Sequence, residues 1–192
     1  GVPLDEWMQT RQRAGTEALP IPEFLSLSAG IVNGLAAVHA AGVIHRSLCP
    51  ASIALNRATG VVKIVSFEVA TTLSRQVPAL TSPTALEGEL AYLSPEQTGR
   101  MNRSVDYRTD FYSLGVTFYE LLTGRLPFEA ADAMELVHAH LARTPAAPAA
   151  VNPEIPEVVS DLVLKLMAKA PEDRYRSAHG LEQDLRLCSQ RW

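Results

Sequence analysis

Apolar residues recur with helical spacing in the first part of the chain. Between residues 22 and 40 they lie three or four positions apart, at Phe24, Leu27, Ile31, Leu35 and Val38. This spacing places them on one face of an α-helix, and Gly42 is a typical helix stop. The apolar pair Trp7 and Met8 predicts a shorter helix within residues 1–15.

The period of the pattern changes at residue 53. The segments IAL (53–55) and VVKIV (61–65) are rich in β-branched residues, and the turn-like NRATG separates them. This pattern predicts a β-hairpin. Residues 71–90 are polar and contain Pro78, Pro83 and Gly88, so we expect a long loop there.

A run that is apolar on nearly every face follows residue 110. FYSLGVTFYELLTG (111–124) predicts a buried helix, with Asp110 as its N-cap. Further helices are predicted at about 131–143, 157–169 and 177–187, the last capped by Ser177, and the Pro-rich segment 145–156 connects two of them. The whole pattern predicts a mainly α domain with one small β element.

Composition narrows the range of partners. The 192 residues have a net charge of −4 and no run of Lys or Arg, so we expect neither a nucleic-acid partner nor a membrane. The longest apolar stretch, at 35–44, is too short to span a bilayer. Two distant cysteines, Cys49 and Cys188, favour a reducing, cytoplasmic location. No signal peptide is visible in GVPLDEWM, and the abrupt start suggests a piece of a longer polypeptide.

Five short motifs follow one another along the chain. They are His45-Arg46-Ser47-Leu48 with Ser52, Ser66-Phe67-Glu68, Ser94-Pro95-Glu96, the segment from Asp110 to Gly115, and Glu172-Asp173-Arg174. Their order and spacing resemble those of serine/threonine protein kinases, in which the first three read H-R-D-L-x-x-x-N, D-F-G and A-P-E. The resemblance covers almost the whole chain. It implies a kinase C-terminal lobe, mainly α-helical with a small β-hairpin beside the catalytic loop.

The resemblance implies one kinase-like domain over residues 1–192, in four parts. Residues 1–21 correspond to the segment after the hinge, 22–75 to a helix, the catalytic loop and the hairpin, 76–107 to the activation segment, and 108–192 to the helical subdomain. The chain contains no kinase glycine-rich loop, so we expect the N-terminal lobe to lie outside it. Residues 94–128 look more narrowly like the kinase-like module of large bacterial multidomain signalling proteins. The implied partners are the N-terminal lobe, further domains of the same polypeptide and other signalling proteins.

The polar groups that a kinase uses in phosphoryl transfer are replaced. By position, Ser47 stands for the catalytic Asp, Cys49 for the Lys beside it, Ser52 and Ser66 for the Mg²⁺ ligands, and Ala54 for a nucleotide contact. A Ser hydroxyl is a poor proton acceptor near pH 7, and Mg²⁺ prefers carboxylates. Loss of a general base alone costs about 10²–10⁴ in rate. The resemblance therefore implies a pseudokinase with a regulatory or docking role, and no cofactor is expected.

An active enzyme stays open as an alternative. No Asp or Glu lies between Glu23 and Glu68, so a substitute carboxylate would have to be Glu68 or Glu89. Glu89 stands where such kinases place a Thr near the catalytic Asp. Either residue could act as a displaced base or metal ligand, with ATP and Mg²⁺ as cofactors. The commoner interpretation of both is a solvated surface Glu.

The retained motif residues are expected to have structural roles. Phe67 should pack beneath the cleft, and His45 should pack or form a hydrogen bond at the base of the loop. Asp110 should accept backbone N–H groups of the loop. A pair between Glu96 and Arg174 should hold the long loop on the helical core.

Arg46 and Cys49 each leave two interpretations open. Arg46 could bind a phosphate on Thr81, Ser82 or Thr84, although a structural hydrogen-bonding role is commoner. Cys49 could be a reactive thiol, but a small buried side chain is the favoured interpretation.

His138 and His140 raise the question of a metal site. Residues two apart on a helix point to roughly opposite faces. We therefore expect no metal site here, and a solvated or half-buried position for both imidazoles.

Overall fold

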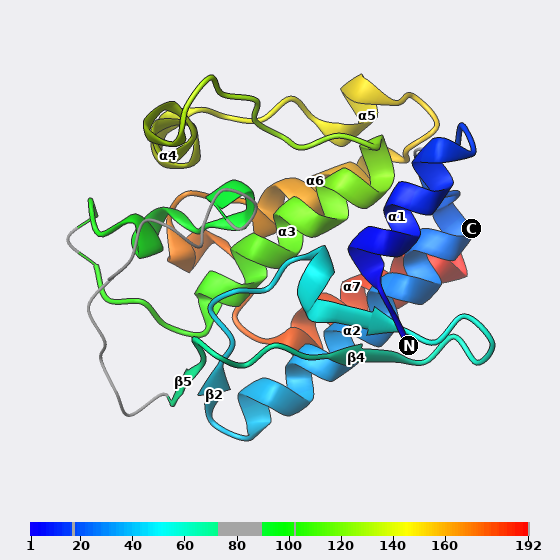
Figure 1. Ribbon diagram of the computed structural model, residues 1–192, viewed down its shortest axis with the longest axis horizontal. Helices are drawn as coiled ribbons and strands as arrows, with labels where there is room; N and C mark the ends of the chain where they lie inside the picture. Colours follow the sequence, from blue (N-terminus) through cyan, green and yellow to red (C-terminus); the bar gives the residue numbers. More distant parts are fainter. Residues whose placement is uncertain (17, 73–89, 102, 192) are drawn as a thin grey trace.

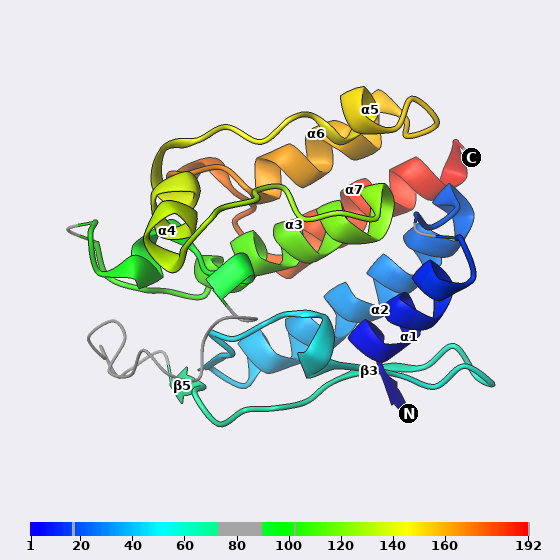
Figure 2. The ribbon, with the colours of Figure 1, turned by 45° about the horizontal axis from the view of Figure 1, so that its top comes forward.

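The helices form one bundle around a central helix, α3 (Arg108–Thr123), and two small sheets lie along one side (Figures 1 and 2). The computed structural model describes residues 1–16, 18–72, 90–101 and 103–191. Both ends of the chain lie at the same end of the molecule (Figure 1). The expectation of a mainly α fold is confirmed.

The first two helices are those that the apolar spacing predicted. α1 covers Leu4–Arg13 and α2 covers Ile21–Ala40. α2 begins after Pro20 and ends before Gly42, whose φ of +71° suits glycine. Phe24, Ile31 and Leu35 on its apolar face are fully buried, which confirms the predicted core face.

The longest apolar segment is longer than the residues 35–44 that we identified from the sequence, because it covers all of α2. The whole helix is long and apolar enough, by length and composition, to cross a bilayer. In the described structure it packs instead along α7 (Ala178–Gln190) and β4 (Val62–Ile64). A Cβ atom at Gly30 would lie only 3.1 Å from Val62 Cγ2, so glycine permits this close packing. This is the packing of a core helix.

The predicted hairpin is present as two antiparallel strands. β3 (Ile53–Leu55) pairs with β4, with Ile53 opposite Ile64, and β1 (Val2–Pro3) pairs with the other edge of β3. A second antiparallel pair, β2 (Val43–Ile44) with β5 (Thr71–Thr72), was not predicted. Two residues are too few to show alternation, and β5 lies where we expected only loop.

α3 is the buried helix that its sequence predicted. Phe111, Leu114 and Phe118 are fully buried, and Gly124, with φ of +73°, ends the helix. The expectation that Asp110 caps this helix is wrong. The helix begins at Arg108, so Asp110 is its third residue and its carboxylate points to the loop before β3.

The C-terminal helices lie close to the predicted ranges. They are α4 (Ala133–Ala142), α6 (Glu157–Leu166) and α7, whose predicted cap Ser177 accepts the N–H of Gly180 at 3.2 Å. α5 (Pro148–Val151) is a short helix within the Pro-rich connector that was not predicted. Short 3₁₀ turns occur at η1 (Pro50–Ser52), η2 (Leu90–Tyr92), η3 (Pro95–Thr98) and η4 (Pro171–Asp173).

Candidate functional site

Asp110 fixes the start of the segment 45–52, which we call the loop. Its Oδ2 accepts the backbone N–H of His45 at 2.9 Å, and Oδ1 accepts that of Arg46 at 2.8 Å. His39 Nε2 donates to Oδ2 at 2.8 Å, and the Asp110 side chain is fully buried. Hydrogen bonds to a carboxylate are about twice as strong as neutral ones. The expected contacts between Asp110 and the loop backbone are confirmed.

Arg46 occupies a strained backbone position. Its φ is +68°, a region that costs a non-glycine residue about 1–2 kcal/mol. Besides Asp110, Gln97 holds this turn by donating from Nε2 to the Arg46 carbonyl at 2.6 Å. Burial lowers the pKa of the Arg46 guanidinium, and the nearby Asp110 charge acts in the opposite direction. Thr81, Ser82 and Thr84 lie outside the described residues, so a phosphate contact stays a prediction.

His45 joins the loop to the segment 66–68. Its side chain is fully buried, and Nε2 donates to the Val65 carbonyl at 2.8 Å. Its ring packs edge-on against Phe67 with centroids 4.8 Å apart. Phe67 keeps 43% of its surface exposed, so it is less buried than we expected. Ser66, between Val65 and Phe67 in the chain, has a φ of +65° and is a second strained position in this site.

Ser52 and Cys49 close the loop with a reciprocal pair of hydrogen bonds. The Cys49 N–H donates to Ser52 Oγ at 2.9 Å, and the same hydroxyl donates to the Cys49 carbonyl at 2.9 Å. Both residues are buried, with exposed fractions of 2% and 6%. The Cys49 side chain is therefore buried, as we favoured. The Ser52 hydroxyl is engaged within the loop itself.

The remaining positions predicted from the motifs lie around this loop. Ser47 is half-buried, while Ser66 and Glu68 are exposed. Ala54 lies in β3 opposite Lys63. Glu68 forms no hydrogen bond or ion pair with another described side chain. Glu89 lies outside the described residues, so its approach to Ser47 stays a prediction.

Glu96 and Arg174, which we call the anchor, form the predicted ion pair. Arg174 Nη1 lies 2.6 Å from Glu96 Oε1 and Nη2 lies 2.8 Å from Oε2, and both side chains are almost fully buried. Arg174 also donates to the carbonyls of Ala168 and Arg108 at 2.8 and 2.9 Å. The bidentate geometry leaves few unsatisfied donors. The anchor thus fastens η3 to the start of α3 and to the chain after α6.

His140 lies next to the anchor and was placed wrongly by sequence reasoning. Its side chain is fully buried, and its Nδ1 atom lies 2.9 Å from the Tyr112 hydroxyl oxygen. Lys169 Nζ donates to the same hydroxyl at 3.4 Å, so this hydroxyl donates to a neutral His140. Burial first, and then the Lys169 charge, lower the pKa of His140 to about 4. Burial also lowers the pKa of Lys169 to about 8, with a further contribution from Arg174. Within the described ranges no three His, Cys, Asp or Glu side chains are grouped to hold a metal ion.

An acidic hollow of about 220 Å³ beside the loop was missed. Asp5, Glu120 and Tyr92 line it, next to Pro50. Tyr92 donates to Glu120 Oε2 at 2.5 Å, and burial raises the pKa of Glu120, with that hydrogen bond acting against it and Asp5 adding to it. Asp5 Oδ1 is buried without a hydrogen-bond partner among the described residues. Two close carboxylates can bind a cationic side chain, but no local pattern links residues of α1 and α3.

Comparisons with known proteins agree with this arrangement. A family model described as the protein kinase domain matches residues 4–185. The serine/threonine-protein kinase Pkn1 of Myxococcus xanthus is 35% identical over 191 residues, which are 98% of this chain and 26% of that protein. A probable serine/threonine-protein kinase of Streptomyces coelicolor is 36% identical over 175 residues, 91% of this chain and 25% of that one.

A third relative is similar over a shorter stretch. The "Hybrid signal transduction histidine kinase G" of Dictyostelium discoideum is 53% identical over 96 residues, which are 50% of this chain and 3% of that protein. This chain therefore spans about a quarter of the two bacterial kinases and a far smaller part of the third protein. With the kinase model matching nearly every described element, the chain belongs to the protein kinase family.

Proposed function

We propose that this kinase domain does not transfer phosphate and serves as a regulatory or docking module of a larger signalling protein. The observation that carries the proposal is the closed pair of hydrogen bonds between Ser52 and Cys49, at the position of a metal ligand. To reach a metal ion, the Ser52 hydroxyl would have to leave two buried partners. Each buried group left unpaired costs about 1–3 kcal/mol.

No described carboxylate is placed to take over the missing chemistry. Asp110 is near the loop, but its two oxygens already accept three donors that hold the loop in place. Glu68 is exposed. Phosphoryl transfer depends on a positioned base and on metal ions that neutralise charge. Without them, this site lacks the groups that make the step fast.

The scaffold around the missing chemistry is intact, which supports a binding role. The anchor and the Asp110 contacts keep the shape of the domain. The acidic hollow with Asp5 and Glu120 offers a partner's Arg or Lys side chain a site beside the loop. The name of the Dictyostelium relative describes a signal-transduction protein, and its much greater length is consistent with a multidomain setting.

An exposed apolar edge supports contact with another domain of the same polypeptide. Val61, Val65, Phe67 and Val69 are exposed by 36–51% and lie along or after the hairpin, and Phe67 packs against His45 of the loop. Several exposed apolar side chains along one short segment are typical of an interaction surface. We assign this segment to contact with the N-terminal kinase lobe of the longer polypeptide.

The test uses the full-length protein with radiolabelled ATP and Mg²⁺. We expect no phosphate on the protein or on a general substrate such as myelin basic protein, and no Mg²⁺-dependent thermal shift with ATP. Phosphate transfer that is lost in Glu68→Gln or Glu89→Gln, and kept in the exposed control Glu154→Gln, would overturn the proposal.

The alternative is an active serine/threonine kinase that uses Glu68 or Glu89. Two observations favour it: the bacterial relatives are named serine/threonine-protein kinases, and the strained turns at Arg46 and Ser66 are those of a preformed site. The same assay separates the two functions, because the alternative requires transfer that depends on one of the two glutamates.

The docking role has a test of its own. An Arg-containing dodecapeptide should bind the full-length protein more tightly than the same peptide with citrulline in place of Arg. Glu120→Gln should remove this preference, whereas Glu154→Gln should keep it. Equal binding of both peptides to the unmodified protein would exclude the acidic hollow as a docking site.

A further inference from the structure

Lys169, which follows α6, lies against buried residues of three other segments. Its Nζ donates to the Tyr112 hydroxyl of α3 at 3.4 Å and to the Ala139 carbonyl of α4 at 3.3 Å. The same atom lies 4.7 Å from the centre of the Phe128 ring, which adds a cation–π contact. Lys169 itself is half-buried. Its amine is therefore held in a defined place at the edge of the core.

No carboxylate is paired with the charge of Lys169. Within the described part of the chain it forms no ion pair. The nearby Arg174 is itself a cation, and it already takes both oxygens of Glu96. His140 shares the Tyr112 hydroxyl with Lys169 and adds no negative charge. The amine thus has neutral partners and a second cation close to it.

This environment favours the neutral amine. Burial first, and then the charge of Arg174, lower the pKa of Lys169 to about 8. A lysine that is desolvated or lies beside another cation is an activated nucleophile, because more of its amine is unprotonated near neutral pH. The two acidic residues of η4 are exposed, and Glu172 pairs with Arg103. Geometry and charge therefore agree that Lys169 is a reactive amine.

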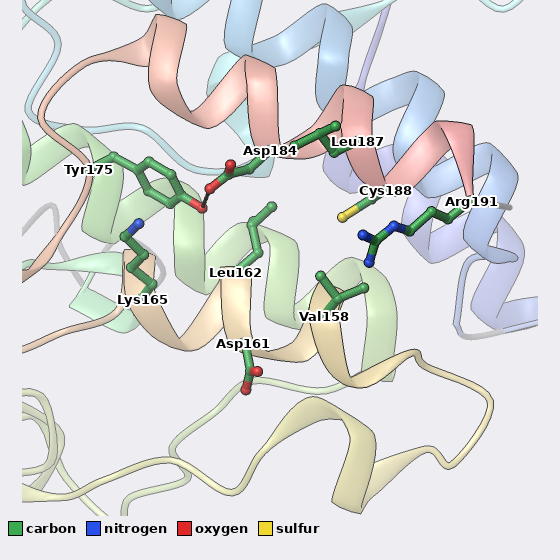
Figure 3. Close-up of a pocket in the computed structure, with 9 residues that line it drawn as sticks. All are labelled: Val158, Asp161, Leu162, Lys165, Tyr175, Asp184, Leu187, Cys188 and Arg191. Carbon is green, nitrogen blue, oxygen red and sulfur yellow. Dashed lines mark hydrogen bonds between the residues drawn. The ribbon is translucent and has the colours of Figure 1, made fainter.

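The chain contains two other lysines, and both are exposed. Lys63 lies in β4. Lys165 lies in α6, where its Nζ is 4.1 Å from the centre of the Tyr175 ring and it lines an open groove of about 290 Å³ between α6 and α7 (Figure 3). Exposure alone would make these two the most reactive lysines of the chain. They are therefore internal controls for the effect of the environment at Lys169.

We propose that Lys169 is a modification site that is acylated by acyl phosphates. The lone pair of Nζ attacks the carbonyl carbon of the donor and forms a C–N bond, while the C–O bond to phosphate breaks. Inorganic phosphate leaves with the bonding electrons, and the proton released by the nitrogen goes to water. A small donor suits a half-buried amine better than a bulky carrier thioester does.

Acylation changes the charge of the cluster. The amide product is neutral, so modification removes the cation beside the Tyr112 hydroxyl. The charge of Lys169 contributes to the lowered pKa of His140, so its removal raises that pKa. The modification therefore alters the electrostatics next to the anchor. It does not depend on whether the domain transfers phosphate.

The test treats the full-length protein with acetyl phosphate at pH 8 and follows each lysine by peptide mass spectrometry. We expect Lys169 to be acetylated at least about threefold faster than Lys63 and Lys165, although it is less exposed. In urea the three rates should become similar, because the environment is lost. Equal or slower acetylation of Lys169 in the folded protein, or a preference that persists in urea, would overturn the proposal. Faster labelling by acetyl-CoA at equal concentration would exclude an acyl phosphate as the preferred donor.

The pH profile separates reactivity from accessibility. The rate at Lys169 in the folded protein should level off above a pH of about 8. In urea the rate at the same residue should keep rising, because an unperturbed lysine has a pKa of about 10.4. Identical profiles would contradict an activated amine.

Two variants complete the test. Lys169→Arg keeps the positive charge without an amine that can be acylated, so it should remove the fast phase of acetate incorporation. Lys63→Arg is the matched control and should keep this phase. A fast phase that survives in Lys169→Arg, or that is lost in Lys63→Arg, would assign the reactivity to another residue and overturn the proposal.

Discussion

The anchor and the loop are both held by buried polar groups, but they use different chemistry. At the anchor, Glu96 and Arg174 are ionised partners joined by two hydrogen bonds. At the loop, Ser52 and Cys49 satisfy each other with neutral groups. The comparison shows that the anchor, which supports the fold, keeps its charged side chains. The loop has neutral side chains at the positions that a kinase uses to bind ATP and Mg²⁺.

Asp110, near the start of α3, is another buried polar residue, and its role is also structural. It is a charged residue beneath the loop, yet its hydrogen bonds run to backbone N–H groups and to His39. These hydrogen bonds therefore orient the loop.

The largest effect is expected when the anchor is broken from one side. Glu96→Gln leaves the buried Arg174 guanidinium opposite a neutral amide, which should lower the free energy of unfolding by about 3–5 kcal/mol. Urea unfolding followed by circular dichroism measures this. Arg103→Gln breaks an exposed Arg–Glu pair, with 42% and 53% exposed side chains, and should barely move the midpoint. Equal losses in both variants would show that burial does not distinguish the two pairs.

The next largest effect is a pH dependence of the free energy of unfolding that is caused by His140, which lies near the anchor. Its pKa is lowered to about 4 from 6.5, so the unfolded chain takes up this proton at a higher pH than the folded one. The free energy of unfolding should then fall as pH drops from 6.5 to 4, by roughly 3 kcal/mol at most.

Thermal unfolding across this pH range measures the slope. His140→Gln should flatten it, since the substituted chain has no proton to take up at this position. His138→Gln, on the exposed part of the same helix, is the matched control and should keep the slope. An unchanged slope in His140→Gln would assign the pH dependence to another group.

A smaller loss of stability is expected when the packing of α3 is disturbed, since α3 supports both the anchor and the loop. A Cβ atom at Gly115 would lie 2.7 Å from Leu166 Cβ and 2.8 Å from Met167 Cγ, so Gly115→Ala should destabilise by about 1–3 kcal/mol. At Gly180 the nearest atoms would lie 3.7 and 3.9 Å away, so Gly180→Ala should be neutral or stabilising by up to about 1 kcal/mol. Urea midpoints compare the two, and a neutral Gly115→Ala would mean that α6 can move away from α3.

The smallest effect is expected in the loop. Ser52→Ala removes the hydroxyl that binds both the N–H and the carbonyl of Cys49, and should lower the free energy of unfolding by about 1–2 kcal/mol. This loss is smaller than that of Glu96→Gln, because no charge is left unpaired. Ser47→Ala, at a half-buried neighbouring position, should change stability by no more than roughly 0.5 kcal/mol. A loss in Ser52→Ala as large as that of Glu96→Gln would remove the distinction between the two regions.

Local patterns predicted much of the fold because they report on local structure. The spacing from Phe24 to Val38 identified α2, and the uniformly apolar run after Asp110 identified the buried α3. The two-residue strands β2 and β5 carry no such period, and α5 is a single short turn of helix within a Pro-rich segment. Their positions follow from how the surrounding chain packs.

Side-chain contacts between distant segments were predicted where the family motif states them, whereas the local cap Ser177 followed from the sequence around it. The Glu96–Arg174 pair and the Asp110 contacts followed from motif positions. The role of Asp110 as a helix cap was inferred from local order alone, and was wrong because its carboxylate points across to another segment. His140 is buried against Tyr112 of α3 and against Phe128, which the sequence around residue 140 does not encode.

The sequence by itself determined that this chain is helical and kinase-like and lacks catalytic carboxylates in the loop, because periodicity and motif spacing are local properties of the chain. Only the tertiary structure decided that the Ser52 hydroxyl is engaged by Cys49, that Asp5 and Glu120 line one hollow, and that α6 and α7 leave an open groove. These features join residues from different elements or depend on which partner a buried polar group finds. Burial and hydrogen-bond satisfaction are properties of the folded chain as a whole.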